Sequence, residues 1–123
     1  PYKGFVYTFD ETKDIAWLYL VSVMMITDYS SVMFDYSILN RPMLFFAYDL
    51  EDYKENLRGF YFDFVNDIPG PISRDTDQLI KDIKEYNEDS WKEKYKNYHD
   101  KFNGIDDGHA SQKVIDVIKK VSR

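Results

Sequence analysis

A short run of hydroxyl and acidic residues at positions 27–31, Thr-Asp-Tyr-Ser-Ser, is the part of this sequence best suited to chemistry. It follows the apolar run 23–26, which indicates a strand, and it precedes an amphipathic segment that is expected to be helical. Ligands of open parallel sheets bind outside the carboxyl ends of the strands, and the start of a helix presents unpaired N–H groups. The hydroxyl groups of Thr27, Ser30 and Ser31 add donors that can turn toward an anion. The run therefore predicts a phosphate site, although these residue types are also common helix caps, and capping alone is the alternative interpretation.

Two acidic residues lie close to this run. Asp35 comes one helical turn later and shares a helical face with the apolar Val32 and Leu39, where a carboxylate is costly unless it has a partner. Asp35 could hold the hydroxyl groups of a ribose, or it could take part in a salt bridge or a cap. Asp28 lies within the run itself and repels a bound anion unless its carboxylate points away.

The order of apolar and amphipathic segments predicts an α/β fold. Strands are expected at residues 5–9, 23–26 and 43–47, the last two as strands buried on both faces. Helices are expected between them, at residues 15–21 and 31–39. Asp14 is suited to cap the first of these helices, and Arg41-Pro42 ends the second. Strands that alternate with helices form right-handed crossovers, so the pattern indicates a Rossmann-like parallel sheet with flanking helices.

The second half of the chain is expected to be mostly helical. A mobile polar loop or a short helix is predicted at residues 49–58 and an extended segment at 59–64, and Pro69-Gly70-Pro71 forms a sharp turn. Three helices then follow, at about residues 75–86, 90–102 and 110–121. The last has an apolar stripe, formed by Val114, Val117, Ile118 and Val121. These helices are expected to cover the sheet.

The composition excludes several classes of function. The 123 residues suffice for one domain, and 44% hydrophobic and 31% charged residues fit a soluble globular protein. A net charge of −6 argues against non-specific binding to nucleic acid or to anionic lipid. There is no cysteine, which excludes disulfides and zinc sites that need sulfur, and no structural metal is expected. No signal peptide or apolar run of membrane-spanning length is visible. The 11 tyrosines and 9 phenylalanines are expected to serve mainly in the core, with platforms for a base or sugar as the alternative.

The run at residues 26–39 closely resembles the signature of CDP-glycerol and CDP-ribitol transferases, enzymes that build teichoic acids in the bacterial cell wall. Further similar motifs follow in the same order, at residues 41–42, 48–51, 58–63, 69–71 and 107–111. The likeness therefore extends over most of the chain. Several spaced motifs in one order are more specific than a single Thr-Asp-Tyr-Ser-Ser match.

The resemblance implies a GT-B fold, in which two Rossmann-like domains face each other across a cleft. Residues 1–123 would form a single, truncated C-terminal domain that binds the nucleotide donor. By the resemblance, Thr27, Ser30 and Ser31 hold the donor pyrophosphate, and Asp35 binds the ribose. The loop at residues 8–14 lies beside the cytosine. From this loop, Thr8 and Asp10 are candidate contacts to the base or ribose. Asp28, Asp49 and Arg58 are candidate contacts to other groups in the cleft.

The reaction implied is the attack of a hydroxyl group at the end of a teichoic acid polymer on the β-phosphorus of CDP-glycerol or CDP-ribitol, with CMP as the leaving group. No cofactor is implied. The family's catalytic histidines lie upstream, and neither His99 nor His109 matches them, so the isolated chain is expected to be inactive. A cytoplasmic location at the inner face of the bacterial membrane is implied, with membrane contact only through regions outside this sequence. The chain departs from the family at Val23, where an acidic residue is usual.

Two other functions fit the same residues. A GT-B glycosyltransferase with another nucleotide-sugar donor would place phosphate at the same turn, and only the specificity for the base would differ. A non-catalytic α/β interaction module would use the serines as caps alone, and no nucleotide would stabilise its fold.

Overall fold

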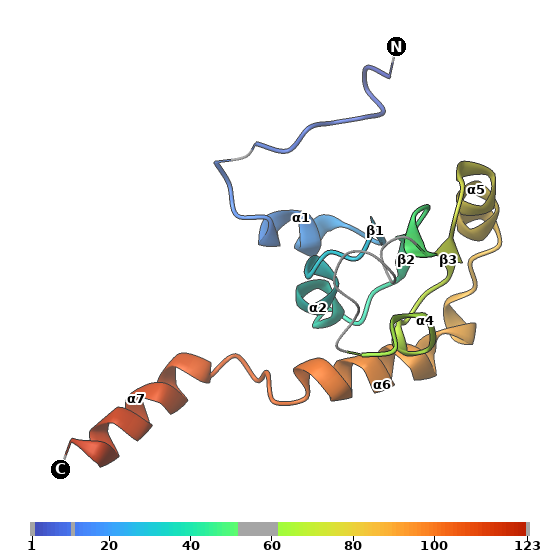
Figure 1. Cartoon of the computed structure of the whole chain (residues 1–123). Coiled ribbons are helices and arrows are strands. Elements are labelled where there is room, and N and C mark those ends of the chain that lie inside the picture. Colours follow the sequence, from blue (N-terminus) through green and yellow to red (C-terminus); the bar gives the residue numbers. More distant parts are fainter. Residues whose placement is uncertain (1, 11, 52–61, 123) are drawn as a thin grey trace.

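The computed structural model describes residues 2–10, 12–51 and 62–122, and it contains a three-stranded parallel sheet (Figure 1). The strands are β1 (Met25–Thr27), β2 (Met43–Phe46) and β3 (Ile72–Ser73), in the order β1-β2-β3. Met25 pairs with Met43, and Phe45 pairs with Ile72, in parallel register on both sides of β2. The predicted α/β fold with a parallel sheet is therefore confirmed.

Helices connect the strands, and most of the helices that the sequence predicts are present. Along the chain, α1 precedes β1 and α2 follows it, and α4 precedes β3 and α5 follows it. α5 contacts β3, and α6 packs against α2. A short 3₁₀ helix, Glu88–Ser90, leads into α6. The helices are α1 (Ala16–Val21), α2 (Val32–Ser37), α4 (Phe64–Asp67), α5 (Thr76–Lys84), α6 (Lys92–Asn103) and α7 (Ala110–Val121).

Three expectations about the elements are wrong. Residues 5–9 form no strand but a turn and a mostly exposed, irregular segment that leads away from the sheet, and no strand of the described residues pairs with it. β1 is consequently at an edge and only half-buried, and Ile26 keeps 47% of its surface exposed. Phe64, expected in an extended segment, instead begins α4, where Asp63 caps the helix by accepting the N–H of Asn66. Residues 52–61 lie outside the described part.

The helix α7 does not cover the sheet, against expectation. Every residue of Ala110–Val121 is exposed, and Figure 1 shows the helix extending away from the rest of the molecule. Its apolar stripe therefore has no partner in the described part of the chain.

The core is built around β2 and is rich in aromatic rings. Met43, Leu44 and Phe45 of β2 are fully buried, and Tyr36 from α2 and Tyr98 from α6 close the core on one side. The rings of Phe34, Phe62, Tyr98 and Phe102 contact one another, with centroid separations between 4.7 and 6.5 Å. These rings lie in the core or pack against it, as predicted.

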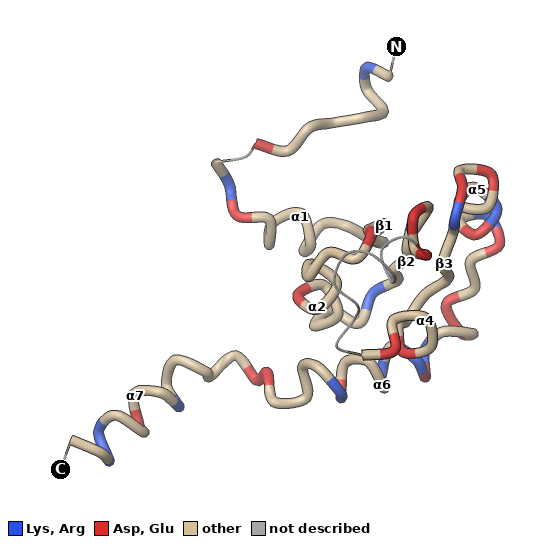
Figure 2. Tube along the Cα trace, viewed as in Figure 1, with Lys and Arg blue, Asp and Glu red and all other residues tan. Residues whose placement is uncertain are grey.

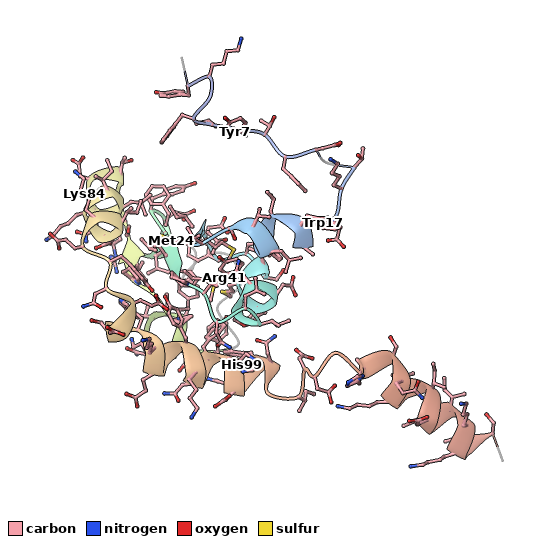
Figure 3. All side chains as sticks on the ribbon, turned by 180° about the vertical axis from the view of Figure 1, so that it is seen from behind. Tyr7, Trp17, Met24, Arg41, Lys84 and His99 are labelled. Carbon is pink, nitrogen blue, oxygen red and sulfur yellow. The ribbon has the colours of Figure 1, made fainter. Side chains whose placement is uncertain are left out.

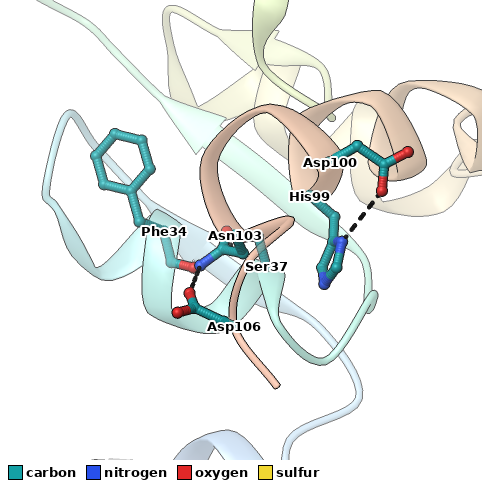
Figure 4. A network of polar contacts seen from close by, with 6 residues as sticks. All are labelled: Phe34, Ser37, His99, Asp100, Asn103 and Asp106. Carbon is teal, nitrogen blue, oxygen red and sulfur yellow. Dashed lines mark hydrogen bonds and ion pairs between the residues drawn. The ribbon is translucent and has the colours of Figure 1, made fainter. Parts of the chain in front are cut away.

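A buried polar contact joins α2 to the end of α6 (Figure 4). The Ser37 Oγ lies 2.5 Å from the Asn103 Oδ1 and 2.7 Å from the carbonyl oxygen of Phe34. The Asn103 Nδ2 in turn donates to Asp106 at 3.2 Å. Because both Ser37 and Asn103 are buried, this contact fixes the register of α6 on α2.

Arg41 holds the end of α1 in place. Its Nη1 lies 3.0, 2.9 and 2.6 Å from the carbonyl oxygens of Tyr19, Leu20 and Ser22 (Figure 3). The last carbonyl groups of a helix have no partner within the helix, and a cation there also interacts favourably with the helix dipole. Arg41 thereby connects α1 to the start of β2.

Gly70 marks the closest approach between the chain that enters β3 and the chain of β2. A Cβ atom at this position would lie 1.9 Å from the carbonyl oxygen of Met43, which is backbone and has little room to move. The next residue, Pro71, uses its carbonyl oxygen to accept the N–H of Phe45 at 2.9 Å. Only a residue without a side chain permits this pairing.

We expect Gly70→Ala to lower the free energy of unfolding by more than about 2 kcal/mol, because the new methyl group forces β3 away from β2. Urea denaturation followed by circular dichroism would measure the change. Gly4→Ala is the control: this glycine has open space around it, so its loss should cost about 1 kcal/mol or less, through its positive φ alone. Equal stability of Gly70→Ala and the wild type would contradict the role assigned to this approach.

Candidate functional site

The turn between β1 and α2 lies at the carboxyl end of β1, as predicted. Thr27 is the last residue of β1, Ser30 is half-buried and Ser31 is exposed. The Asp28 Oδ1 accepts the N–H of Ser30 at 2.8 Å, and the Ser30 Oγ accepts the N–H of Val32 at 3.5 Å. The expectation that the amide groups at this helix start are free is therefore partly wrong, because two of these N–H groups donate hydrogen bonds within the turn.

Ser31 is the part of the turn that stays open to a ligand. It has helical backbone angles (φ −61°, ψ −12°), its side chain makes no capping hydrogen bond, and its N–H has no acceptor among the described residues. α2 has only six residues, so its dipole is weaker than that of the longer helix predicted at 31–39. The hydroxyl groups and the Ser31 amide, more than the helix dipole, are what this turn offers to an anion.

A hydrogen bond joins the carboxyl ends of β1 and β2. The Tyr29 hydroxyl donates to the Asp49 Oδ1 at 2.7 Å, and the Tyr29 ring packs edge-on against Phe64 at 5.5 Å. Burial, the hydrogen bond to Asp49 and then the nearby negative charges raise the pKa of Tyr29 well above its usual range. Tyr29 therefore stays protonated and fixes the position of Asp49, one of the predicted cleft contacts.

The carboxyl ends of β2 and β3 flank a small polar hollow of about 110 Å³. Arg74, directly after β3, forms an ion pair with Glu51 at 3.1 Å in this hollow, which Tyr48 and Asp49 also line. Sequence reasoning did not single out Arg74. The strand-end rule could have found it, but β3 has only two residues and gives too short a pattern to be recognised.

The structure places Asp35 on the side of α2 that faces α1. Its side chain is exposed, so the expected cost of burying its charge does not arise. Together with Asp14, Ile15 and Tyr19, Asp35 lines a hollow of about 340 Å³ between the two helices. Burial and the charges of Asp35 and Asp14 together raise the pKa of Tyr19. The role of Asp35 toward a ribose stays a prediction.

The other predicted residues are not brought to the turn. Thr8 and Asp10 are exposed and belong to the N-terminal segment, which Figure 3 shows far from the sheet at Tyr7. Thr12 donates two hydrogen bonds to the Asp10 carboxylate, and these bonds lower the pKa of Asp10. Arg58 lies outside the described residues. The roles of all three stay predictions.

The two histidines lie apart from the turn. His99 is half-buried and lies 3.4 Å from the Asp100 carboxylate (Figure 4), and His109 is exposed before α7. Within the described ranges, no three acidic or histidine side chains are placed to share a metal ion. None of the described helices has the length and apolar character needed to cross a membrane.

A parallel sheet with flanking helices belongs to the class of open α/β folds, whose ligands bind outside the carboxyl ends of the strands. Residues 1–120 match the family model of CDP-Glycerol:Poly(glycerophosphate) glycerophosphotransferases, and the chain belongs to this family. The family resemblance of the motifs is therefore confirmed.

Curated relatives are similar over almost the whole chain. The chain is 44% identical to the teichoic acid poly(glycerol phosphate) polymerase of Bacillus subtilis strain 168, over 98% of this chain and 16% of that protein. It is 42% identical to the teichoic acid glycerol-phosphate transferase of Staphylococcus aureus strain NCTC 8325, over 97% of this chain and 31% of that protein. The chain thus spans less than a third of the length of both relatives.

A solved structure has the same fold. The wall teichoic acid polymerase TagF superposes with a TM-score of 0.84 at 43% identity, over 97% of this chain and 30% of that chain. A TagF variant soaked with CDPG superposes with a TM-score of 0.83 at 41% identity. The described sheet and helices are therefore part of a GT-B-like α/β fold, as predicted.

We expect Tyr29→Phe to change the pH dependence of stability. Folding raises the pKa of Tyr29, so the protonated hydroxyl group stabilises the folded state. This stabilisation is fully present below the pKa of an unfolded tyrosine, about 10, and is lost as the pH rises from there through the higher pKa of the folded state. Urea unfolding of both proteins between pH 8 and pH 11 should show the wild type more stable at pH 8 and the difference shrinking toward pH 11. A difference that stays constant over this range would contradict the Tyr29–Asp49 interaction.

Proposed function

We propose that this chain is the donor-binding portion of a polyol-phosphate transferase of teichoic acid synthesis, with CDP-glycerol or CDP-ribitol as donor. The observation that carries the proposal is the match to the transferase family through residues 1–120, together with the shared fold of TagF, a variant of which was solved after a CDPG soak. Relatives include both glycerol-phosphate and ribitol-phosphate polymerases, so either donor fits.

The donor pyrophosphate is proposed to bind Thr27, Ser30 and Ser31. Support comes from the position of these residues at the carboxyl end of a parallel strand and from the open amide and hydroxyl groups of Ser31. The Ser30 Oγ holds the Val32 N–H only at 3.5 Å, a long contact that a phosphate oxygen could replace. Asp28 orients the turn through the Ser30 N–H and is proposed to lie at the edge of the ligand.

The rest of the nucleotide is proposed to extend from this turn toward α1. Asp35 would bind the ribose hydroxyl groups, and Thr8 and Asp10 would reach the cytosine, which requires the N-terminal segment to move toward the open edge of β1. Asp49 and Arg58 are proposed as further contacts in the cleft. The whole chain would then act as one C-terminal, donor-binding domain that faces a second domain across that cleft.

In the proposed reaction, a hydroxyl group at the end of a teichoic acid polymer attacks the β-phosphorus of the donor, and CMP leaves. This chain would hold the pyrophosphate through amide and hydroxyl donors, which also stabilise the charge that develops on the phosphoryl oxygens. The base that takes the proton of the attacking hydroxyl would come from regions outside this sequence. Those regions would also hold the enzyme at the inner face of the cell membrane.

The test is binding of CDP-glycerol by the chain and by a Ser30→Ala/Ser31→Ala variant, measured by NMR titration and by thermal shift. We expect the variant to bind at least about tenfold more weakly, because it loses two hydroxyl donors to the phosphates. The control is Ser111→Ala/Ser122→Ala, which removes two exposed hydroxyl groups, one in α7 and one directly after it, and should not change binding. Equal binding by Ser30→Ala/Ser31→Ala and the wild type would sink the phosphate assignment.

Two other outcomes identify the alternatives. Preference for a UDP-sugar over CDP-glycerol and CDP-ribitol would indicate a sugar transferase. Failure of every nucleotide to bind would favour an interaction module. The hydrogen bonds that Asp28 and Ser30 make within the turn also fit that alternative. The chain by itself is expected to show no measurable release of CMP from CDP-glycerol, because neither described histidine lies at the turn.

A further inference from the structure

The small hollow between the carboxyl ends of β2 and β3 differs in character from the larger hollows of the molecule. Its volume is about 110 Å³, and Asp49, Glu51 and Arg74 give it two carboxylates and one guanidinium group. The two hollows beside α1, with volumes of about 390 and 340 Å³, are lined mainly by apolar side chains. Pockets for drug-sized ligands begin at about 300 Å³, so the small hollow suits one compact polar group and not a nucleoside.

The hollow adjoins the turn that is proposed to hold the donor pyrophosphate. Neighbouring strands of a sheet lie about 5 Å apart, so the end of β2 is next to the end of β1, where the turn begins. The hydrogen bond from the Tyr29 hydroxyl in the turn to Asp49 in the hollow, at 2.7 Å, joins the two places directly. Figure 2 shows acidic segments in the loop after β2 beside the basic segment between β3 and α5. A short group attached to a phosphate at the turn can therefore reach these charged side chains.

The charges of the hollow favour hydroxyl groups over a further phosphate. Its two carboxylates outnumber its one guanidinium group, so a second anion would be repelled on balance. A hydroxyl group both donates and accepts a hydrogen bond. Adjacent hydroxyl groups can donate to the Asp49 and Glu51 carboxylates and accept from Arg74, and such charge-assisted hydrogen bonds are about twice as strong as neutral ones. The chemical match is a neutral polyol.

The ion pair inside the hollow leaves both of its partners accessible. The Arg74 Nη2 lies 3.1 Å from the Glu51 Oε1, and the two side chains are 60% and 62% exposed. An ion pair this exposed contributes little to stability. A guanidinium group has five N–H donors, and Glu51 is the one ion-pair partner of Arg74 among the described residues. Hydroxyl groups of a ligand can thus bridge or replace this pair without destabilising the fold.

An exposed aromatic ring completes the lining of the hollow. Tyr48 packs its ring against that of Phe46, with the ring centroids 5.9 Å apart, and most of its surface remains exposed. The carbon atoms of a polyol are apolar, and an aromatic ring offers them a surface to cover. The hollow therefore combines hydrogen-bonding groups for hydroxyls with a surface for the carbon chain that carries them.

We propose that this hollow binds the polyol unit of a substrate, a glycerol or ribitol group with adjacent hydroxyl groups. Asp49 and Glu51 accept hydrogen bonds from the hydroxyls, Arg74 donates one to them, and Tyr48 covers the carbon atoms. The polyol belongs either to the nucleotide donor or to the end of the acceptor polymer, because both carry the same hydroxyl groups. The choice of ligand class rests on the proposed function, whereas the site consists of residues beside those proposed for the pyrophosphate.

NMR titration of the 123-residue chain tests the site with probes that distinguish the two sources. CDP-glycerol carries a polyol, and CDP does not. If the donor polyol occupies the hollow, CDP-glycerol shifts the backbone signals of residues 48–51 and 74, and CDP leaves them unchanged. If the acceptor polyol occupies it, two glycerol units joined by one phosphate shift the same signals, in the presence and in the absence of CDP.

We expect Glu51→Gln/Arg74→Gln to bind the polyol probe that shifts these signals about tenfold more weakly and to bind CDP as the wild type does, because only the hydroxyl groups lose charged partners. Both side chains are exposed, so the NMR spectrum should show an unchanged fold. The matched control is Asp89→Asn/Lys92→Gln, which removes another exposed ion pair, between the 3₁₀ helix and the start of α6, and should leave binding unchanged.

Three results would overturn the proposal. Neither polyol probe shifts the signals of the hollow, or the Glu51→Gln/Arg74→Gln variant binds the polyol probe as the wild type does, or it loses affinity for CDP as much as for CDP-glycerol, which would indicate a phosphate site. Failure of the proposed function has a different signature. In that case CDP and CDP-glycerol leave the signals of residues 27–31 unchanged, whereas the probe with two glycerol units still shifts those of the hollow.

Discussion

The structure depends on β2, the strand that is paired on both sides and buried on both faces. Its residues pair with β1 on one side and with β3 on the other, and Met43 and Phe45 belong to the same buried cluster as Tyr36 of α2 and Tyr98 of α6. The close approach at Gly70 lets β3 pair with this strand, and Arg41 ties α1 to its beginning. The loops that carry Tyr29, Asp49 and Arg74 are held at one edge of the sheet because all three strands are parallel and in register with β2.

The candidate turn combines two demands that compete for the same amide groups. Asp28 and Ser30 satisfy backbone donors inside the turn, which stabilises the turn without a ligand. Ser31 remains outside these contacts and faces solvent. A turn organised in this way has its shape before an anion arrives, so less ordering of the chain is needed on binding. The same internal contacts limit the number of donors that remain for the anion.

The sequence predicted the elements whose signal is local and left out those that depend on distant partners. The run at 43–47 and the helices after residue 75 follow from apolar runs and periodicity, and they are present within a few residues. The segment at 5–9 has the composition of a strand, yet a strand forms only against a paired neighbour. The exposure of α7 was missed for a related reason. An apolar stripe indicates that a helix will be covered, but it does not indicate which surface will cover it. Within the site, Thr27, Ser30 and Ser31 could be placed from the strand-end rule, whereas the Tyr29–Asp49 contact needs the lateral order of the strands, which local patterns do not contain.

Arg41 gives the Arg41-Pro42 motif a structural explanation. Three carbonyl oxygens from the end of α1 and the residue after it lie around one guanidinium nitrogen, and the proline that follows leads directly into β2. A planar guanidinium group can face several acceptors at fixed angles, whereas the compact ammonium group of a lysine presents its donors differently. The motif therefore preserves a joint between a helix and a strand, and a sequence comparison that took every shared arginine for a phosphate ligand would assign this one to the wrong part of the molecule.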